Sequence, residues 1–386
     1  MNITTVTKKY NTKAKCIAYL EKVRWGKGKP ICPFCNSKNS SKLNELGRYH
    51  CNACNTHFSV LVGTIFYDTR LDLPKWFQLI TIVVNAKQGI SSKELERNIG
   101  LTYKTAWLCA MRVRCAMIES QQALQYVVEM DEAYVGGKPK RKNSKGEIVE
   151  IDRKLPDNTP SICQSNIDTK PNKRGRGTNK TPVLAIVERN GQVVLKVAKR
   201  LTSKVLIEML RENVKLQPST KVMTDDYRGY MKFDDIIRHY TVNHSKGEYV
   251  SAKDKSIHTN TIEGFFSILK RSIKGNYIAI SKKYLPMYLA QTQFSYNHRN
   301  IKTDLFDYFM KNAMAHEKCM LNYKPIEDPA KISYIPSKTK SKTKIKPCVA
   351  CQLIKKKPIR KVKRKKTIVK SINTSSYEKS RVKKLS

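Results

Sequence analysis

The sequence predicts an α/β domain with a mixed sheet and flanking helices, preceded by a zinc ribbon and a helix-turn-helix. Three observations predict this order: two Cys-x2-Cys pairs, two helical segments joined by a glycine-containing turn, and then a strand, a hairpin, a helix and a strand. We assign these parts to residues 14–62, 72–120 and 125–315. A basic loop insertion is expected at 138–180 and a disordered basic tail at 331–386.

The chain is strongly basic. Its 386 residues include 75 Lys and Arg against 31 Asp and Glu, which gives a formal net charge of +44. A charge of this size favours the phosphate backbone of nucleic acid as the partner. An anionic membrane surface is the alternative, but no long amphipathic basic helix supports it. Hydrophobic residues make up 40% of the chain, which excludes a wholly disordered protein.

The sequence does not indicate a membrane protein or a secreted protein. The longest apolar run, from Leu79 to Val84, is too short to span a bilayer. The polar stretch from Met1 to Tyr10 lacks the apolar segment of a signal peptide. We therefore expect no membrane partner. The expected location is the nucleus if the host is eukaryotic, and otherwise the cytoplasm or nucleoid.

The first block carries a strong metal-binding pattern. Cys32 and Cys35 form one Cys-x2-Cys pair, and Cys51 and Cys54 form a second pair after 15 intervening residues. Four thiolates close a tetrahedral shell around one Zn²⁺ and leave no open position, so this site is expected to be structural. His50 and His57 lie nearby, but four cysteines suffice, and a surface or packing role is the simpler interpretation.

The second block is typical of a helix-turn-helix. Ser91 to Glu94 is a capping pattern that opens one helix, and Thr102 caps the next after a turn at Gly100. The second of these helices would lie in a DNA major groove. The residues expected at its groove-facing end are Tyr103, Lys104 and Thr105, and those expected to reach phosphates are Arg112 and Arg114. An ordinary helical bundle remains the alternative.

The third block places acidic residues beside predicted strands and on a helix. Asp131 follows a β-type run that begins at Tyr126, and Asp225 follows a short strand that begins at Lys221. Between them, Asn190-Gly191 predicts a hairpin turn. A later helix has an apolar face, and Glu263 and Lys270 lie two turns apart on another face.

Two aspartates at strand ends and a glutamate on a packed helix suit a Mg²⁺ or Mn²⁺ cluster, because hard cations take oxygen ligands. Two ions about 4 Å apart can activate the attacking oxygen and stabilise the leaving oxygen in phosphodiester cleavage. Lys270 would contact DNA phosphate near the reacting strand. The alternative is that the aspartates belong to ordinary turns and that Glu263 pairs with Lys270.

The basic tail contains one further cysteine pair, Cys348 and Cys351. Two thiolates do not complete a tetrahedral zinc site, so we do not assign a metal there. The tail is expected to bind DNA without sequence preference or to act as a nuclear-import signal.

In this order, the motifs resemble those of DDE transposases of the Merlin type and their bacterial insertion-sequence relatives. The resemblance covers about residues 14 to 303 and includes both cysteine pairs. Its most specific parts are Glu129 to Gly137, Thr224-Asp225, and the stretch from His258 to Lys270.

The resemblance implies an RNase H-like catalytic domain. It implies catalytic acids at Asp131, Asp225 and Glu263, which would hold Mg²⁺, with Lys270 as a companion. Asn260 is the alternative third metal ligand, because some relatives have Asn at a similar position. Asp226 is the alternative to Asp225. His258 and His244 are possible catalytic or supporting residues, and structural hydrogen bonding is the competing interpretation of both.

The expected function is therefore a DNA transposase. It would bind the terminal inverted repeats of its element, cleave a phosphodiester at each end, and join the freed 3′-hydroxyl to target DNA. Two ends imply a homodimer or a higher assembly. The first alternative is a catalytically retired transposase that acts as a sequence-specific DNA-binding protein. The second is a structure-specific nuclease.

Overall fold

The structure is a computed structural model. It describes residues 1–119, 122–136, 178, 180–243, 247–251 and 254–315, and the backbone of 141–142 and 148–149. All of them belong to one unit of the chain, Met1–Lys342. Most of the predicted basic loop, all of the predicted basic tail, His244, Cys348 and Cys351 lie outside the described residues.

Six helices share one apolar core. They are α1 (Ile3–Lys9), α2 (Lys13–Trp25), α3 (Leu73–Asn85), α4 (Ser92–Ile99), α5 (Tyr103–Ala116) and α9 (Leu305–Ala315). Trp76 and Phe77 of α3 are fully buried at its centre. The sequence predicts that the helix beginning near Pro74 ends at Gly89, but this helix, α3, already ends at Asn85.

The predicted pair of short helices is present. Ser91 Oγ accepts from the Glu94 N–H at 3.1 Å and begins α4. Gly100 adopts a left-handed conformation and ends it, as is common at helix C-termini. Thr102 Oγ1 accepts from the Thr105 N–H at 3.4 Å and begins α5. These contacts confirm the helices and the turn, while DNA binding by this pair stays a prediction.

The N-terminal sheet is a three-stranded antiparallel meander. It consists of β1 (Ser40–Lys42), β2 (Arg48–Cys51) and β3 (Thr56–Ser59). Its small apolar core holds Tyr49 and Phe58 beside two of the cysteines. Tyr49 Oη donates to the carboxylate of Glu21 on α2 at 2.8 Å, which attaches the meander to that helix.

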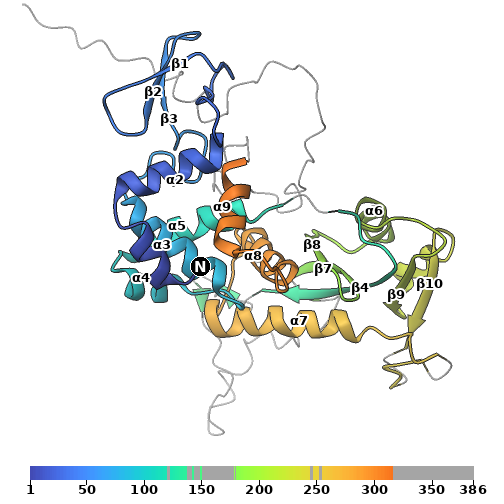
Figure 1. The fold of residues 1–386 in the computed structure, drawn as a ribbon. Coiled ribbons are helices and arrows are strands. Elements are labelled where there is room, and N and C mark those ends of the chain that lie inside the picture. Colours follow the sequence, from blue (N-terminus) through green and yellow to red (C-terminus); the bar gives the residue numbers. More distant parts are fainter. Residues whose placement is uncertain are drawn as a thin grey trace, which may run out of the picture. The chain divides into compact units, whose positions relative to one another are not determined.

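The central sheet is mixed and has five strands in the order β10-β9-β4-β7-β8 (Figure 1). The strands are β4 (Val127–Val135), β7 (Thr181–Glu188), β8 (Val193–Val197), β9 (Lys221–Asp225) and β10 (Arg238–Val242). β4, β7 and β8 are antiparallel, whereas β9 and β10 run parallel to β4. The predicted hairpin joins β7 to β8, and Asn190 has φ +57° in its turn. A separate antiparallel pair, β5 (Arg141–Lys142) and β6 (Ile148–Val149), lies within the predicted loop insertion.

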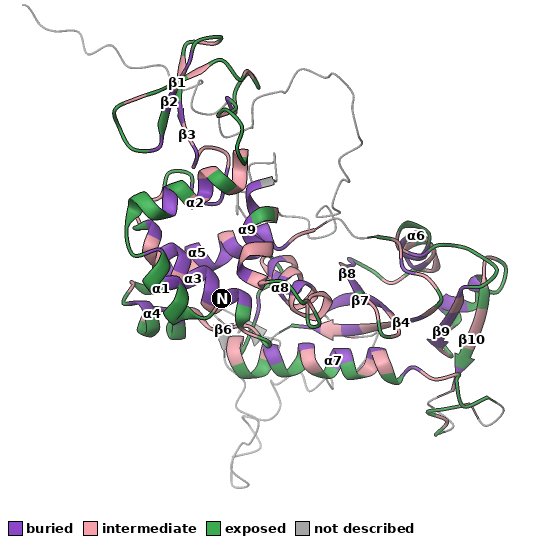
Figure 2. Cartoon of the chain, viewed as in Figure 1, coloured by how far each residue is buried: buried purple, intermediate pink, exposed green. Residues whose placement is uncertain are grey.

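Helices cover both faces of this sheet. One face packs against α6 (Ser203–Asn213) and the 3₁₀ turn η3 (Arg228–Phe233). The other face packs against α7 (Asn260–Ser272) and α8 (Leu285–Asn297). α7 continues into a π-helical turn, η5 (Ile273–Tyr277). Buried residues line the strands and the inner side of α7, while its outer side is exposed (Figure 2). The predicted RNase H-like α/β architecture is confirmed.

Candidate active site and metal centre

The four cysteines of the ribbon converge. Their Sγ atoms all lie within 4.8 Å of one another. Cys32 Sγ lies 3.6 Å from Cys54 Sγ, and Cys35 Sγ lies 3.5 Å from Cys51 Sγ. A tetrahedral ion with Zn–S bonds of about 2.3 Å requires sulfur separations of about 3.8 Å. The thiol positions therefore fit one Zn²⁺.

The backbone forms the two halves of this site in the same way. The residue after each pair, Asn36 or Asn55, has a positive φ of 60° or 52°. Asn tolerates this left-handed conformation better than most residues, so each chain segment can turn sharply after its second cysteine. Both pairs consequently direct their sulfur atoms at one point.

The electrostatics of the cluster suit a metal ligand set. Burial alone would raise the Cys51 pKa, but hydrogen bonds from the backbone N–H groups of Cys54 and Ala53 outweigh it and lower the pKa to about 7. Burial raises the pKa of Cys32 to about 12. A bound cation favours the thiolate form of all four side chains, and metal binding therefore releases protons.

Asp131 lies within a strand rather than at its end. The sequence predicts a turn from Asp131 onward, but β4 continues to Val135, and Asp131 pairs with Ala185 of β7. This expectation is wrong because eight residues of β4 pair with β7, a partner about 50 residues away that local sequence does not reveal. Asp131 is thus fixed by ladder pairing instead of by a loop.

Asp225 lies beside Asp131 on the neighbouring strand. β4 and β9 pair in parallel, with Val127 opposite Lys221 and Glu129 opposite Met223. Continuing this register by two residues brings Asp131 opposite Asp225. Val222 packs on the α6 face of the sheet, so Asp225, three residues later, points to the opposite face.

Asp131 points to that same face. Val128 and Met130 pack toward α6, whereas Ala133 and Val135 pack toward α7. Side chains alternate along a strand, which places Asp131 on the α7 face. Glu263 lies in the first turn of α7. The three predicted acids therefore come from β4, β9 and α7 and meet at one face of the sheet.

The pKa of Asp131 reflects this convergence. Burial, together with the negative charges of Glu132, Asp225 and Glu263, raises it to about 8, against one backbone hydrogen bond from Glu132 that lowers it. Like charges that repel in this way are relieved by a bound cation. The donor set is entirely oxygen, as Mg²⁺ requires.

The acids are less tightly grouped than the thiols. Among the residues that the structure describes, the cysteine cluster is the one set of three or more potential ligands whose donor atoms all lie within 4.8 Å.

The remaining predicted site residues lie along α7 or just before it. Asn260 is the first residue of α7 and is exposed, one turn before Glu263. Lys270 is exposed in the last turn, about 10 Å along the helix from Glu263. His258 Nδ1 lies 3.1 Å from Arg189 Nη2. Because a guanidinium only donates, His258 Nδ1 is the acceptor in this contact.

Two residues that were not predicted as site residues form a buried bridge beside the acids. Glu129 of β4 is fully buried, and its Oε1 accepts from Arg189 Nε at 2.7 Å. Its Oε2 accepts from the backbone N–H of Ile262 in α7 at 2.9 Å. The sequence feature that indicates a buried role for Glu129 is its position as a lone carboxylate in the apolar run Val127-Val128-Glu129-Met130.

The predicted DNA contacts on α5 are only partly accessible. Tyr103 and Lys104 are exposed, and Thr105 is partly exposed. Arg112 Nη1 donates to the carbonyl oxygens of Ile65 and Tyr67, at 3.2 and 2.9 Å. These two bonds commit Arg112 to holding the chain that precedes α3.

Arg114 is buried and therefore not available to a DNA phosphate, so that expectation is wrong. Its side chain is fully buried, and Nε donates to Gln291 Oε1 at 2.8 Å. Its guanidinium lies 4.3 Å from the ring centre of Tyr288. Arg114 thus joins α5 to α8 inside the protein.

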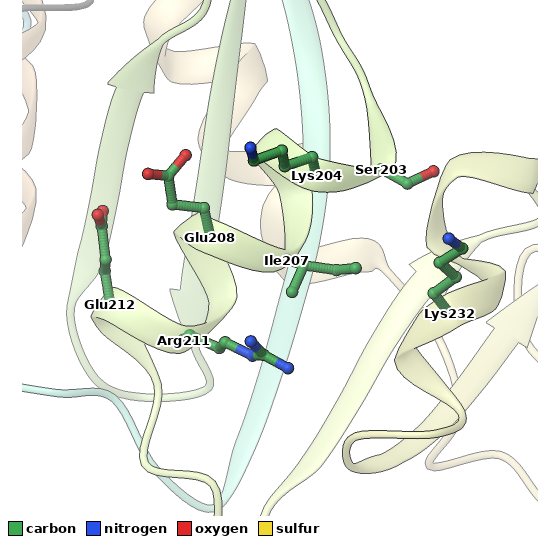
Figure 3. Close-up of a pocket in the computed structure, with 7 residues that line it drawn as sticks. All are labelled: Ser203, Lys204, Ile207, Glu208, Arg211, Glu212 and Lys232. Atoms are coloured by element: carbon green, nitrogen blue, oxygen red, sulfur yellow. The ribbon is translucent and has the colours of Figure 1, made fainter.

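A surface hollow on the opposite face of the sheet contains none of the predicted site residues. α6 contributes Lys204, Ile207 and Glu208 to it, and Lys232 faces them from η3 (Figure 3). Its lining includes charges of both signs, which gives it no selectivity for an anion such as DNA phosphate.

The fold and the two sites define a class: an α/β domain with converging acids, preceded by a Cys₄ ribbon. Residues 123–297 match the family model of the ISXO2-like transposase domain, and residues 11–57 match that of the transposase zinc-ribbon domain. These two matches confirm the resemblance to transposases that was drawn from the motifs. The ribbon match and the four-cysteine cluster together support a structural Zn²⁺.

A relative from Halobacterium salinarum, described as an uncharacterized protein in transposable element ISH50, is 28% identical over 284 residues. The match covers 71% of this chain and 87% of the relative.

Two solved structures are similar at 10% identity. The Mos1 strand transfer complex has a TM-score of 0.24 and covers 65% of this chain and 79% of its own. A pre-cleavage Mos1 transpososome has a TM-score of 0.25 and covers 85% and 98%.

Proposed function

We propose that this transposase binds the terminal inverted repeats of its element, cleaves a phosphodiester at each end, and joins the freed 3′-hydroxyl to target DNA. The observation that carries the proposal is the convergence of Asp131, Asp225 and Glu263 at one face of a rigid sheet. Burial and the repulsion between these carboxylates raise the pKa of Asp131, as expected of groups arranged to hold a cation.

Each side chain has a distinct task in this proposal. Asp131 and Asp225 supply oxygen ligands from neighbouring strands, and Glu263 supplies a third from α7. Bound Mg²⁺ or Mn²⁺, as two ions, would activate the attacking oxygen and stabilise the leaving oxygen of the phosphodiester. Lys270 lies on the exposed side of α7 and would hold the DNA phosphate in line. Asn260 is adjacent to Glu263 on the same helix and is the alternative third ligand.

The DNA-binding surface is proposed to combine the ribbon with the exposed N-terminal end of α5. Tyr103 and Lys104 are accessible there, and Thr105 is close to them. The net charge of +44 adds attraction to any DNA sequence. Two element ends require at least two active sites, so the working form is proposed to be a homodimer or a higher assembly.

The direct test is a cleavage assay with the full chain and a labelled duplex that carries the end of the element, in Mg²⁺ or Mn²⁺. Asp225→Asn is expected to abolish cutting at the repeat boundary and to leave DNA binding within twofold of wild type. Asp226→Asn is the matched control, because Asp226 is the next residue, is exposed, and accepts a hydrogen bond from Asn243 at 2.8 Å.

A labelled 3′ end that becomes joined to plasmid DNA would establish strand transfer and exclude a plain nuclease. Equal cutting by wild type and Asp225→Asn would refute the assigned acid. End-specific binding with no cutting in either metal would favour the retired, DNA-binding alternative.

A further inference from the structure

A buried bridge at Glu129 links the sheet to α7. This carboxylate is fully buried, and an ionised group in that position must be paired. Both of its oxygens are used: Oε1 by Arg189 Nε at 2.7 Å and Oε2 by the Ile262 N–H at 2.9 Å. The second bond connects β4 to α7 across 133 positions of sequence.

The Ile262 N–H belongs to the first turn of α7. The first N–H groups of a helix have no partner within the helix and must find an acceptor elsewhere. A carboxylate is the acceptor best suited to this end, because the helix dipole is positive there. Glu129 therefore caps α7 from a strand and fixes where the helix begins.

Arg189 completes the attachment by holding the chain that leads into α7. Its Nη1 donates to the Ser256 carbonyl oxygen at 2.7 Å, and its Nη2 donates to the His258 carbonyl oxygen at 2.9 Å. Nη2 also lies 3.1 Å from His258 Nδ1. One guanidinium thus ties Glu129, Ser256 and His258 together. The structural role of His258 is therefore to contact Arg189 in this bridge.

The bridge is adjacent to the acids at both ends. Glu129 lies two residues before Asp131 on the same strand and the same face, and Ile262 directly precedes Glu263. We propose that Glu129 and Arg189 are positioning residues that hold Glu263 against Asp131 and Asp225. This inference rests on the proposed function, because it assigns Glu263 to the cation site.

Glu129→Gln tests the inference. Glutamine keeps the size of the side chain but has one carbonyl oxygen and one NH₂ group, so it cannot accept from both Arg189 and Ile262. The expected results are faster amide hydrogen exchange at Ile262 and Glu263, and an Mn²⁺ affinity of the zinc-loaded protein that falls about 10- to 100-fold. Exchange is followed by NMR or mass spectrometry, and Mn²⁺ binding by electron paramagnetic resonance.

The matched control is Glu212→Gln on α6, which removes an ion pair with Lys196 at 3.0 Å away from the acids. It should leave both readouts at wild-type values. If Glu129→Gln folds poorly, Arg189→Lys supplies the second variant, since it keeps the charge but loses the fork that holds Ser256 and His258. It should shift both readouts in the same direction.

A merely structural bridge would lower the melting temperature and leave the Mn²⁺ affinity of the folded fraction unchanged, which would overturn the inference. So would unchanged exchange at Ile262 in both variants. If the wild-type protein binds Mn²⁺ through Glu263 but never cuts DNA, the proposed function is refuted. The exchange and Mn²⁺ measurements would still decide the role of Glu129.

Discussion

At Asp131, the arrangement proposed to hold a cation lowers the stability of the metal-free fold. Its carboxyl is surrounded by the charges of Glu132, Asp225 and Glu263, and its pKa rises from 3.8 to about 8. Strand pairing with Ala185 prevents it from moving away. The metal-free protein therefore carries a local electrostatic cost that a divalent cation would offset.

The sign of the pH dependence follows from this pKa. Between about pH 4 and pH 8 the folded protein binds a proton at Asp131 that the unfolded chain has lost, so the free energy of unfolding falls as pH rises through this range. We expect Asp131→Asn to stabilise the metal-free protein at pH 8 by about 1–2 kcal/mol. Thermal unfolding at pH 6 and pH 8, followed by circular dichroism, measures the difference.

Added Mn²⁺ should raise the melting temperature of wild type and not that of Asp131→Asn, because only the former keeps the ligand. Asp226→Asn provides the comparison. Parallel pH profiles for wild type and Asp131→Asn would show that Asp131 does not titrate in this range.

Single residues also show which contacts can be predicted from the sequence and which cannot. Asp131, Asp225 and Glu263 were selected from their places in strand and helix patterns, and the structure brings them to one face. The prediction that Arg114 contacts phosphate is wrong, because it depends on the usual exposure of an arginine on a helix, whereas Arg114 is fully buried. Its partner Gln291 lies 177 positions away, and no local pattern reveals such a contact.

At the scale of elements, the ribbon depends on its metal. Its apolar core is restricted to Tyr49, Phe58 and two cysteines, with a few partly buried neighbours. A core of this size cannot offset the entropy of ordering the three strands, so the Zn²⁺ must supply the difference.

Removal of one ligand should therefore unfold the ribbon alone. Cys35 is exposed, so Cys35→Ser changes little besides metal binding. We expect loss of the single zinc per chain, rapid proteolysis between residues 27 and 62, and at least tenfold weaker binding to element ends. The α/β domain should keep its melting transition.

Metal content by mass spectrometry and limited proteolysis provide the measurements. Cys109→Ala is the control, because Cys109 is buried in α5 outside the cluster. Full zinc content in Cys35→Ser would contradict a four-thiolate site.

Some helices and strands can be predicted from the sequence and others cannot, for a physical reason. The helices of residues 72–120 and the hairpin at Asn190-Gly191 depend on caps and turns within a few residues, and both are confirmed. The length of β4 depends on β7, and its last residues have no strand signal without that partner. The role of Glu129 depends on the register of β4 and on α7, which only the folded chain defines.

For the molecule as a whole, charge is the dominant property. Residues 331–386 contain 20 Lys and Arg and one acid, so they carry +19 of the total of +44. The first 330 residues carry the other +25. Each phosphate neutralised by Lys or Arg releases counterions, which makes DNA affinity depend steeply on salt.

Deletion of residues 331–386 should weaken binding to random DNA more than binding to element ends. We expect the slope of log affinity against log salt concentration to become shallower by several units, at about 0.9 per lost phosphate contact. Fluorescence anisotropy between 50 and 300 mM salt gives this slope, and a tail with its Lys and Arg replaced by Gln separates charge from length. An unchanged slope would show that the tail does not contact DNA.

The pairing of β4 with β7 makes the chain between them unusually free to vary in length. Eight residue pairs, from Val128 with Glu188 to Val135 with Thr181, set the register independently of what connects the two strands. Insertions after Gly136 can accumulate there without moving Asp131. A single deletion inside β4 would instead turn Asp131 toward α6. Lineages of this transposase should therefore diverge in the connection and keep the strand at constant length.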